Sequence, residues 1–418
     1  MAIQKITTDI IEDNAVTGTK ISVGTPAAGD IFYYDGTDYT KLPIGTPGQT
    51  LVLESGLPTW GVGTGGIPSG ALPGFPFHGN HWQYGGNFGG IAGNTILYHS
   101  FTSDNHAIVG HNASIGSTAF PSISSAAGGM SSSTEAYFMS GHIGHLPGQP
   151  TVDATEKFAF ASATTAQNGA TDICSTTSGG VGSPRVFGHG QYCCESGTHG
   201  YLASGRSGDL SSFGYADPNG TVRKLEFATG NVTSNIATLQ DGARAGHAAV
   251  SGQTHAYWGG GHYGHQNSQN PFPTTSIDRF TFANDNMQKN WDDLSDDRGS
   301  GQTTSSSTTH GYFYAGHSTS HAPNPGVLVT TIEQISFASS GQGTGHGDIA
   351  AVGRTGANSG QTQTHGYEIT GYTYVGSVSL TTVNGYSFAS NTQAAQTADL
   401  GITVDNGPAG AQAPTFSF

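Results

Sequence analysis

The sequence is poor in charge, above all in positive charge. Only 10% of its 418 residues are charged, and 28 aspartates and glutamates outnumber 13 lysines and arginines, for a formal net charge of −15. A nucleic-acid-binding surface needs clustered lysine and arginine to neutralise phosphates, so this composition predicts no nucleic-acid partner. Disordered chains combine low hydrophobicity with high charge. This chain lacks that charge and contains 10% aromatic residues, which favours a folded protein.

Cysteines and long hydrophobic runs are also scarce. The three cysteines, Cys174, Cys193 and Cys194, do not form the even-numbered framework of a disulfide-stapled protein. No run of about 18 apolar residues is present, so we expect no membrane insertion. The first residues lack the apolar core of a signal peptide, which predicts a protein made in the cytoplasm that does not use the standard secretory route.

Glycine is abundant, with 65 residues, and helical patterns are missing. No apolar stripe of period 3.6 persists over several turns, which argues against long helices. Many short strands joined by glycine-rich turns fit this composition better. The predicted fold class is therefore all-β.

A phrase that ends in a glycine step recurs along the chain. It reads WQYGG, YFMSG, YLASG, YWGGG, YFYAG and YEITG, and begins at Trp82, Tyr137, Tyr201, Tyr257, Tyr312 and Tyr367. A second phrase with alternating apolar residues follows each copy and ends on Phe101, Phe160, Phe227, Phe282, Phe337 and Phe388. Repeats of about 55 residues with several short strands predict a six-bladed β-propeller, in which these phenylalanines pack between neighbouring blades.

The chain ends suggest how the ring is closed. The first unit begins at Trp82 without a leading strand, and no unit follows the tail 407–418. We therefore expect the tail to supply the missing strand of the first blade, which leaves no raw sheet edge. The predicted domains are an N-terminal stalk at 1–61, a Gly/Pro-rich linker at 62–79 and the propeller at 80–418.

The stalk has patterns of its own. Residues 5–22 are weakly amphipathic and predict a short helix, and Asp35-Gly36 within 29–42 predicts a β-hairpin. Residues 45–61 predict a second hairpin. Elements this small cannot bury enough surface alone, so we expect them to oligomerise, with three chains as the preferred number.

Two parts of the chain resemble known families. The fourth repeat, ARAGHAAVSGQTHAYWGGGHYG followed by SIDRFTF and NWDDL, resembles a kelch repeat through its diglycine and the later Trp291, although other copies carry SG, AG or TG instead. Lys5-Ile6-Thr7, residues 9–21, GDIFYYDGTDY and GTPGQTLVLESGLPTW are similar to N-terminal segments of bacteriophage fibre and virion structural proteins. The first resemblance implies a propeller whose last strand closes the first blade. The second implies that the N-terminus attaches to other proteins of the particle and that small β modules thread together as trimers.

The histidines fall into two sets. His199, His255, His310 and His365 begin the glycine-step phrase in four units, and this repetition indicates a structural role, with each imidazole bonded to the backbone of a neighbouring blade. The second set follows the glycine step and comprises His142, His145, His262, His265, His317 and His321. Neutral imidazoles bind transition metals. However, the three pairs come from the second, fourth and fifth units, so we favour polar loop packing, with a metal site as the alternative, and expect no cofactor.

Patterns for catalysis are weaker still. Tyr192-Cys193-Cys194 resembles the constellation of a kelch-type copper oxidase only superficially. The acidic run 292–297 is local, and we interpret it as a solvated turn rather than the separated carboxylate pair of a glycosidase. We therefore expect no enzymatic activity, and a polysaccharide depolymerase is the least favoured alternative.

The preferred hypothesis is a virion fibre or spike that displays the propeller to a host receptor or glycan. Its candidate contact residues, all in or near one loop, are Trp258, His262, Tyr263 and His265. The alternative is a capsid decoration or head-fibre protein with no receptor role.

Overall fold

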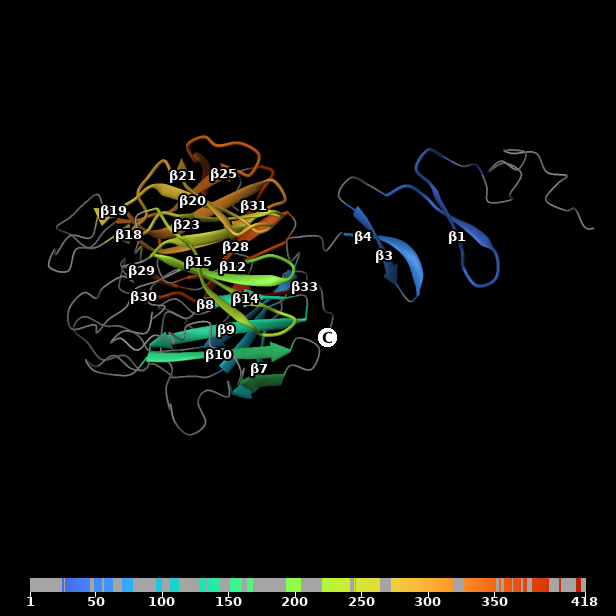
Figure 1. Ribbon diagram of the computed structural model, residues 1–418, viewed down its shortest axis with the longest axis horizontal. Helices are drawn as coiled ribbons and strands as arrows, with labels where there is room; N and C mark the ends of the chain where they lie inside the picture. Colours follow the sequence, from blue (N-terminus) through green and yellow to red (C-terminus); the bar gives the residue numbers. More distant parts are fainter. Residues whose placement is uncertain are drawn as a thin grey trace, which may run out of the picture. The chain divides into compact units, whose positions relative to one another are not determined.

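A computed structural model gives the fold for a defined part of the chain. It describes residues 25, 27–45, 49–54, 56–62, 70–77, 95–99, 106–112, 128–132, 134–142, 151–159, 164–167, 193–203, 220–240, 244, 246–263, 272–318, 327–350, 353–354, 357–362, 364–369, 371–373, 378–390, 398–399 and 411–414. The chain divides into two compact units, Met1–Thr64 and Gly65–Phe418. The regular structure of the described residues consists of β-strands, as predicted (Figure 1). No helix long and apolar enough to cross a membrane occurs in these ranges.

The first unit contains the two predicted hairpins. Strands β1 (Ile31–Tyr34) and β2 (Tyr39–Leu42) pair with each other, as do β3 (Gln49–Glu54) and β4 (Leu57–Val62). The first turn follows from its residues, because Asp35 Oδ1 accepts hydrogen bonds from the amides of Thr37 and Asp38 at 2.8 and 2.9 Å, and Gly36 adopts a φ of 102°. The predicted helix at 5–22 lies outside the described residues.

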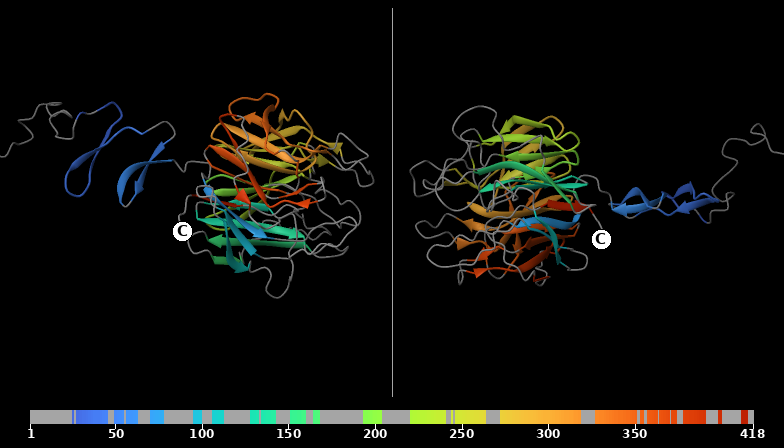
Figure 2. Two further views of the ribbon diagram at one scale, coloured as in Figure 1. Left: turned by 180° about the vertical axis from the view of Figure 1, so that it is seen from behind. Right: turned by 90° about the horizontal axis from the view of Figure 1, so that it is seen from below.

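The second unit is a β-propeller, which Figure 2 shows in two further views. Four consecutive blades are antiparallel sheets in which the first strand in the chain is the innermost. They comprise β12 (Cys193–Glu195), β13 (His199–Ala203), β14 (Thr221–Glu226) and β15 (Val232–Thr238); β16 (Ala248–Ser251), β17 (His255–Gly259), β20 (Ser276–Thr281) and β21 (Asn286–Asp293); β22 (Ser300–Ser306), β23 (His310–Ser318), β25 (Thr331–Ser336) and β26 (Thr344–Asp348); and β27 (Asn358–Gln361), β28 (His365–Ile369), β31 (Thr382–Ser387) and β32 (Ala398–Asp399).

Short additional strands lie between the second and third strands of three of these blades. They are β18 (His262–Tyr263) with β19 (Phe272–Pro273), β24 (Val327–Leu328) beside the end of β23, and β29 (Tyr372–Thr373) with β30 (Val378–Ser379). Each extends the connection at the end of its second strand into a two-stranded ribbon.

Two further four-stranded sheets contain the earlier strands of this unit. One contains β8 (Gly128–Ser131), β9 (Glu135–His142), β10 (Thr151–Ala159) and β11 (Thr164–Gln167), and the other contains β5 (Gly70–Phe77), β6 (Thr95–His99), β7 (His106–Asn112) and the C-terminal β33 (Ala411–Pro414). The order of the second sheet is β33-β5-β6-β7.

Strand β5 corrects the predicted domain boundaries. The range 62–79 was expected to be a linker, yet Gly70–Phe77 forms a strand between β33 and β6. Glycine and proline are depleted in strands, so the sequence GALPGFPF conceals this one. Strand β5 also occupies the second place in its sheet, where the Trp82 phrase was expected, and Trp82 itself lies outside the described residues.

Aromatic stacking joins neighbouring blades, as the repeats predicted. Phe227, Phe282, Phe337 and Phe388 each stack on the tyrosine of the preceding unit, Tyr137, Tyr201, Tyr257 and Tyr312, with ring centroids 5.0, 5.1, 4.9 and 4.7 Å apart. The prediction is confirmed for these four phenylalanines. Phe101 and Phe160 lie outside the described residues.

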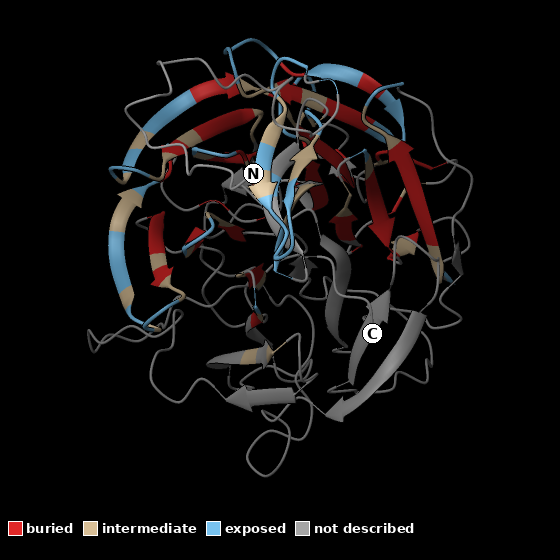
Figure 3. Ribbon diagram, turned by 90° about the vertical axis from the view of Figure 1, so that its right-hand side faces the viewer, coloured by how far each residue is buried: buried red, intermediate tan, exposed pale blue. Residues whose placement is uncertain are grey.

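Burial follows the position of each strand within its blade. Figure 3 shows buried inner strands and more exposed strands at the rim. The innermost β16 is almost wholly buried, whereas most of the outermost β15 is accessible. The inner strands approach closely where glycine lies between blades, since a Cβ at Gly259 would come within 2.8 Å of the Phe313 ring.

Candidate functional site

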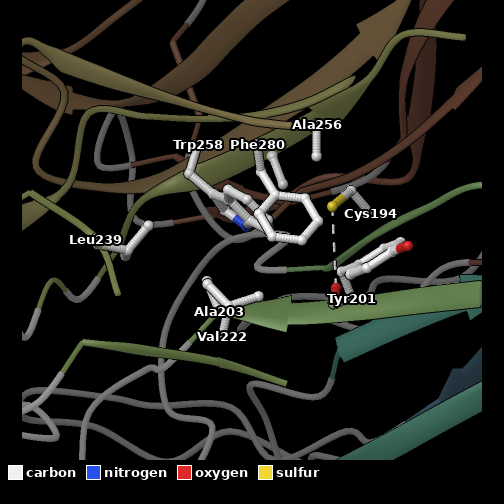
Figure 4. Close-up of a cluster of buried hydrophobic side chains, with 9 residues drawn as sticks. Cys194, Tyr201, Ala203, Val222, Leu239, Ala256, Trp258 and Phe280 are labelled. Carbon is white, nitrogen blue, oxygen red and sulfur yellow. Dashed lines mark hydrogen bonds between the residues drawn. The ribbon is translucent and has the colours of Figure 1, made fainter. Parts of the chain in front are cut away.

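The predicted loop contact Trp258 is a core residue. Its side chain is 0% exposed and lies in a cluster that includes Tyr201, Cys194 and Phe280 (Figure 4). The indole meets the Phe280 ring edge-on at a centroid distance of 5.9 Å. The prediction of a surface contact is therefore wrong for Trp258, because both faces of a propeller blade are covered by neighbouring blades and an alternating strand has no solvent side.

The other candidate contacts and the candidate metal ligands lie at or beyond the ends of second strands. His262 and Tyr263 form β18, whose backbone pairs with Pro273 and Phe272 of β19. His142 is the last residue of β9, and His317 lies near the end of β23. His145, His265 and His321 are outside the described residues. Where the structure describes the chain, it brings together no group of three potential metal-ligating side chains.

The histidines that begin the second strands have a structural role, but with a different partner. In each, Nδ1 lies 2.7 to 2.9 Å from the hydroxyl of the preceding threonine, in the pairs Thr198–His199, Thr254–His255, Thr309–His310 and Thr364–His365. Each imidazole also lies near the tyrosine two residues further on. The predicted bond to a neighbouring blade's backbone is thus replaced by one within the same turn, because the threonine hydroxyl is adjacent.

The backbone of the next blade is instead bonded by tyrosine. The hydroxyls of Tyr137 and Tyr257 each lie 3.4 Å from a carbonyl oxygen of the following blade, that of Phe227 and Phe337 respectively. Partial burial lowers the pKa of the His199, His255 and His310 imidazoles and so favours their neutral form. The turns at His199, His255 and His310 are therefore hydrogen-bonded structural elements whose imidazoles favour the neutral form.

Three buried arginines form ion pairs that the sequence reasoning missed. Arg244 lies 2.7 Å from Asp278, Arg298 lies 3.5 Å from Glu333 and Arg354 lies 3.0 Å from Glu368, and all six side chains are at most 4% exposed. Each arginine precedes the innermost strand of its blade. Their spacing of 54 and 56 residues, in a chain with few cations, was the available signal.

These arginines also hold backbone carbonyls. Arg244 donates to the carbonyl oxygens of Ser276 and Trp258 at 2.7 and 3.3 Å, and Arg298 donates to those of Ala315 and Thr331 at 3.3 and 3.0 Å. Each side chain thus ties the turn before the innermost strand to the second and third strands of its blade. Burial raises the pKa of Glu368 to about 7, although Arg354 opposes the shift.

The last residues of the innermost strands form a polar belt from blade to blade. Ser131 Oγ lies 3.5 Å from Glu195 Oε1, the Glu195 amide donates to Ser251 Oγ at 3.0 Å, and the Ser306 amide donates to Gln361 Oε1 at 2.5 Å. Burial raises the pKa of Glu195 to about 7. The belt contains one hydroxyl, amide or carboxyl group from each of five sheets, linked in two stretches, Ser131–Glu195–Ser251 and Ser306–Gln361, and is a structural seam.

The acidic run 292–297 is more ordered than a solvated turn. Asp292 is buried, and its Oδ2 accepts a hydrogen bond from the amide of Gly341 in the next blade at 2.9 Å. Asp297 accepts one from Ser318 Oγ at 2.6 Å. The interpretation as a solvated turn is therefore wrong for Asp292, because its carboxylate is buried and hydrogen-bonded to the next blade.

The vicinal cysteines are inert. Cys193 and Cys194 are free and buried, and burial raises the pKa of Cys194 well above its usual range. The Cys194 thiol points to the carbonyl oxygen of Tyr201 in its own blade at 4.0 Å.

No family model matches this chain, and no curated protein matches it either. The buried titratable groups described above belong to turns, ion pairs and seams. The features left for recognition are the face of the N-terminal hairpins and the ribbons at the ends of the second strands.

Proposed function

We propose that this chain is a bacteriophage virion protein of the fibre or spike type, which displays a propeller for attachment to a receptor or glycan on the host surface. The observation that carries the proposal is the N-terminal unit. None of its described hydrophobic residues is buried, and it holds six of the seven large apolar side chains exposed in the described chain: Phe32, Tyr34, Tyr39, Ile44, Leu51 and Leu57. A unit without its own core needs other chains to cover it, which agrees with its resemblance to phage attachment segments.

The partners of this unit are further copies of the chain and other virion proteins. The β1–β2 register places Phe32, Tyr34 and Tyr39 on one face, and the two tyrosine rings lie 5.6 Å apart. Their exposed fractions of 39, 56 and 63% leave an aromatic surface open in a single chain. Three copies that turn this face inward would form a common core, with the residues before it free to attach to the particle.

The propeller in this proposal is a kelch-like ring of six blades. Two observations support that number. The sheet β33-β5-β6-β7 joins the C-terminus of the unit to its start, and β33 contacts β8 while β27 contacts β5. Strand β33 would then close the ring, with the first and last blades side by side.

The protein acts in this proposal by binding and not by catalysis. It is made in the host cytoplasm and becomes part of the virus particle. Its acidic groups Glu195, Glu368 and Asp292 serve contacts between strands or blades, which is why we assign them no catalytic role.

The test of location is an averaged electron-microscopy image of intact particles, with mass spectrometry to establish that the chain is present. We expect density for the propeller at the tail or baseplate. Density on the head surface would favour a decoration or head-fibre protein without a receptor role. Absence of the chain from purified particles would refute the proposal.

The test of self-association is light scattering of the full-length chain after size-exclusion chromatography. We expect a particle of three times the chain mass. The triple substitution Phe32→Ser, Tyr34→Ser and Tyr39→Ser should release monomers, whereas Val378→Ser, at an exposed position of the propeller unit, should not. A monomeric native chain would contradict the trimer.

A further inference from the structure

Three consecutive blades carry the same device at the end of the second strand. Gly261, Gly316 and Gly371 recur at 55-residue intervals and adopt φ values of 89, 82 and 107°. This left-handed conformation is open to glycine at little cost. It turns the chain out of each blade and into the ribbons β18–β19, β23–β24 and β29–β30.

The same hydrogen bond closes the base of each ribbon. The amides of Thr274, Val329 and Leu380 donate to the carbonyl oxygens of Gly261, Gly316 and Gly371 at 2.9, 2.9 and 2.7 Å. The ribbons therefore start from equivalent points of their blades. Figure 1 shows β18, β19, β29 and β30 at the same end of the propeller.

Two of the ribbons are also fixed to the following blade. The amide of Gly261 donates to the carbonyl oxygen of Arg298 at 2.7 Å, and that of Gly316 donates to the carbonyl oxygen of Arg354 at 2.9 Å. Both arginine side chains are themselves held in buried ion pairs. The bases of neighbouring ribbons are thus connected through rigid groups, which suits a preorganised binding surface.

Backbone strain occurs at one of these turns. Ala315 has a φ of 57°, a left-handed conformation that is unfavourable for a residue with a Cβ. Strain of this kind persists where the surrounding structure over-determines it, and it often accompanies functional sites.

The chemistry of the three connections is uniform. Ranges 260–275, 316–330 and 371–381 contain no Asp, Glu, Lys or Arg; the first is rich in Asn, Gln, His and Thr, the second in His, Ser and Thr, and the third in Tyr, Ser and Thr. The residue after the glycine is His262, His317 or Tyr372. On the third ribbon Val378 is 49% exposed and Tyr372 is half-buried.

This composition matches an uncharged, hydroxyl-rich ligand. Amides, hydroxyls and imidazoles both donate and accept hydrogen bonds, and aromatic rings add apolar contact area with a polar edge. Recognition of phosphate or carboxylate draws on charge-assisted bonds from arginine or lysine, which these connections do not contain.

We propose that the three ribbons form one binding face for a neutral polysaccharide. The inference rests on the proposed function, because it names the ligand class and the surface used for host attachment. The connections contain no charged residue, and Asp297 beside the second ribbon is already bonded to Ser318. We therefore expect binding to be insensitive to ionic strength.

The test uses the full-length chain and immobilised polysaccharides, with dextran, mannan and galactan as neutral probes and alginate and heparin as anionic ones. We expect binding to at least one neutral probe, unchanged between about 50 and 500 mM salt. The triple variant His262→Ala, His317→Ala and Tyr372→Ala should bind that probe at least tenfold more weakly, with an unchanged circular dichroism spectrum. If the triple variant misfolds, a second measurement uses the native chain. Soluble neutral polysaccharide should then inhibit its binding to host cells.

A matched control lies at the opposite ends of the same second strands. Gln253 and Thr308 are exposed in the turns that precede β17 and β23, and their double alanine variant should bind normally. Binding to anionic probes alone, or no loss in the ribbon variant, would overturn the inference, as would failure to bind every neutral probe. Binding of the native chain to host cells is measured in parallel. If one of these overturning results is obtained while the native chain still binds host cells, the neutral-glycan face is refuted but the proposed function stands. If the native chain does not bind host cells, the proposed function is refuted as well.

Discussion

At the scale of single residues, a stacked ring pair recurs at the junctions between blades. Tyr257 and Phe337 lie nearly parallel, with 12° between their planes, and the Tyr257 hydroxyl reaches the Phe337 carbonyl oxygen. The ring of Tyr257 also contacts Trp291, whose other neighbour is the Arg279 guanidinium at 5.1 Å. The stack therefore links two blades through apolar area, ring geometry and one hydrogen bond.

Removal of one ring should weaken the propeller measurably. We expect Phe337→Ala to lower the free energy of unfolding by about 2 to 4 kcal/mol, because a half-buried ring and its stacking contact with Tyr257 are lost. Chemical denaturation checks this value. Val378→Ala serves as the control and should change stability by less than about 0.5 kcal/mol, since its side chain is exposed. Equal stabilities of the two variants would contradict a role for the stack.

Glu195, a carboxyl group in the inner belt, contributes to the pH dependence of stability. The folded pKa of Glu195 is about 7, above its ordinary value of 4.5, because burial disfavours the charged form. The folded protein therefore retains a proton that the unfolded chain releases. The resulting contribution to stability is complete below pH 4.5 and is lost as the pH rises through 7.

The isosteric substitution Glu195→Gln should remove this contribution. We expect the variant to be more stable than the native chain at pH 8, by about 1 to 3 kcal/mol, and nearly equal to it at pH 4. Thermal unfolding across this range measures the effect. Asp348→Asn, at an exposed carboxylate, should leave the difference between the two pH values unchanged. If the native chain and Glu195→Gln had equal stability at pH 4 and again at pH 8, Glu195 would not contribute to the pH dependence.

At the scale of elements, each buried arginine holds three parts of one blade together. Arg244 precedes β16, donates to the backbone at the end of β17 and the start of β20, and pairs with Asp278 within β20. Asp278 in turn accepts hydrogen bonds from the amides of Gln240 and Asn290 at 2.8 and 2.7 Å. The ion pair thus sets the position of the turn before β16 relative to the sheet.

Loss of one partner of this pair should be costly. We expect Arg244→Met to lower the free energy of unfolding by about 3 to 5 kcal/mol, because Asp278 is left buried without its cation. Denaturant unfolding, with soluble expression as a first indicator, checks the effect. The exposed substitution Lys289→Met is the control for loss of a positive charge. If the two variants are equally stable, the buried pair does not hold the blade.

At the scale of the whole molecule, the proposed closure of the propeller depends on the C-terminal strand. Strand β33 pairs with β5 through Ala411, Gln412 and Ala413, which face Gly74, Pro73 and Leu72. Nearly the whole length of the second unit separates these segments in the chain. Without β33, the innermost place of that sheet would be empty and β5 would present an open edge.

Deletion of residues 407–418 should therefore open the ring. We expect the shortened chain to be largely insoluble, or to unfold at a much lower temperature than the native chain. The matched control ends after Pro414, which keeps β33 and removes only the four residues behind it. A 407–418 deletion that stays soluble and equally heat-stable would show that the ring does not depend on this strand.

The repeats allowed much of the architecture to be predicted. Tyrosine and phenylalanine at regular intervals indicated propeller blades and their stacking, and Asp35-Gly36 indicated the first hairpin, because these signals are local or periodic. Strand β5 was missed since its glycines and prolines are typical of a linker. Trp258 was predicted to be a loop contact because it directly precedes the glycines at the end of its strand. Only the packing of two blades shows that it is buried.

The sequence by itself determined the all-β class, the blade period, the residues of the inter-blade stacks and the uncharged connections after the glycine steps. Each of these follows from residue type and spacing along the chain. The tertiary structure decided the partners. It paired β33 with β5 and the arginines with Asp278, Glu333 and Glu368, and it placed three ribbons at equivalent points of consecutive blades. These contacts join segments that are distant in the chain, and no local pattern specifies which of many compatible groups will meet.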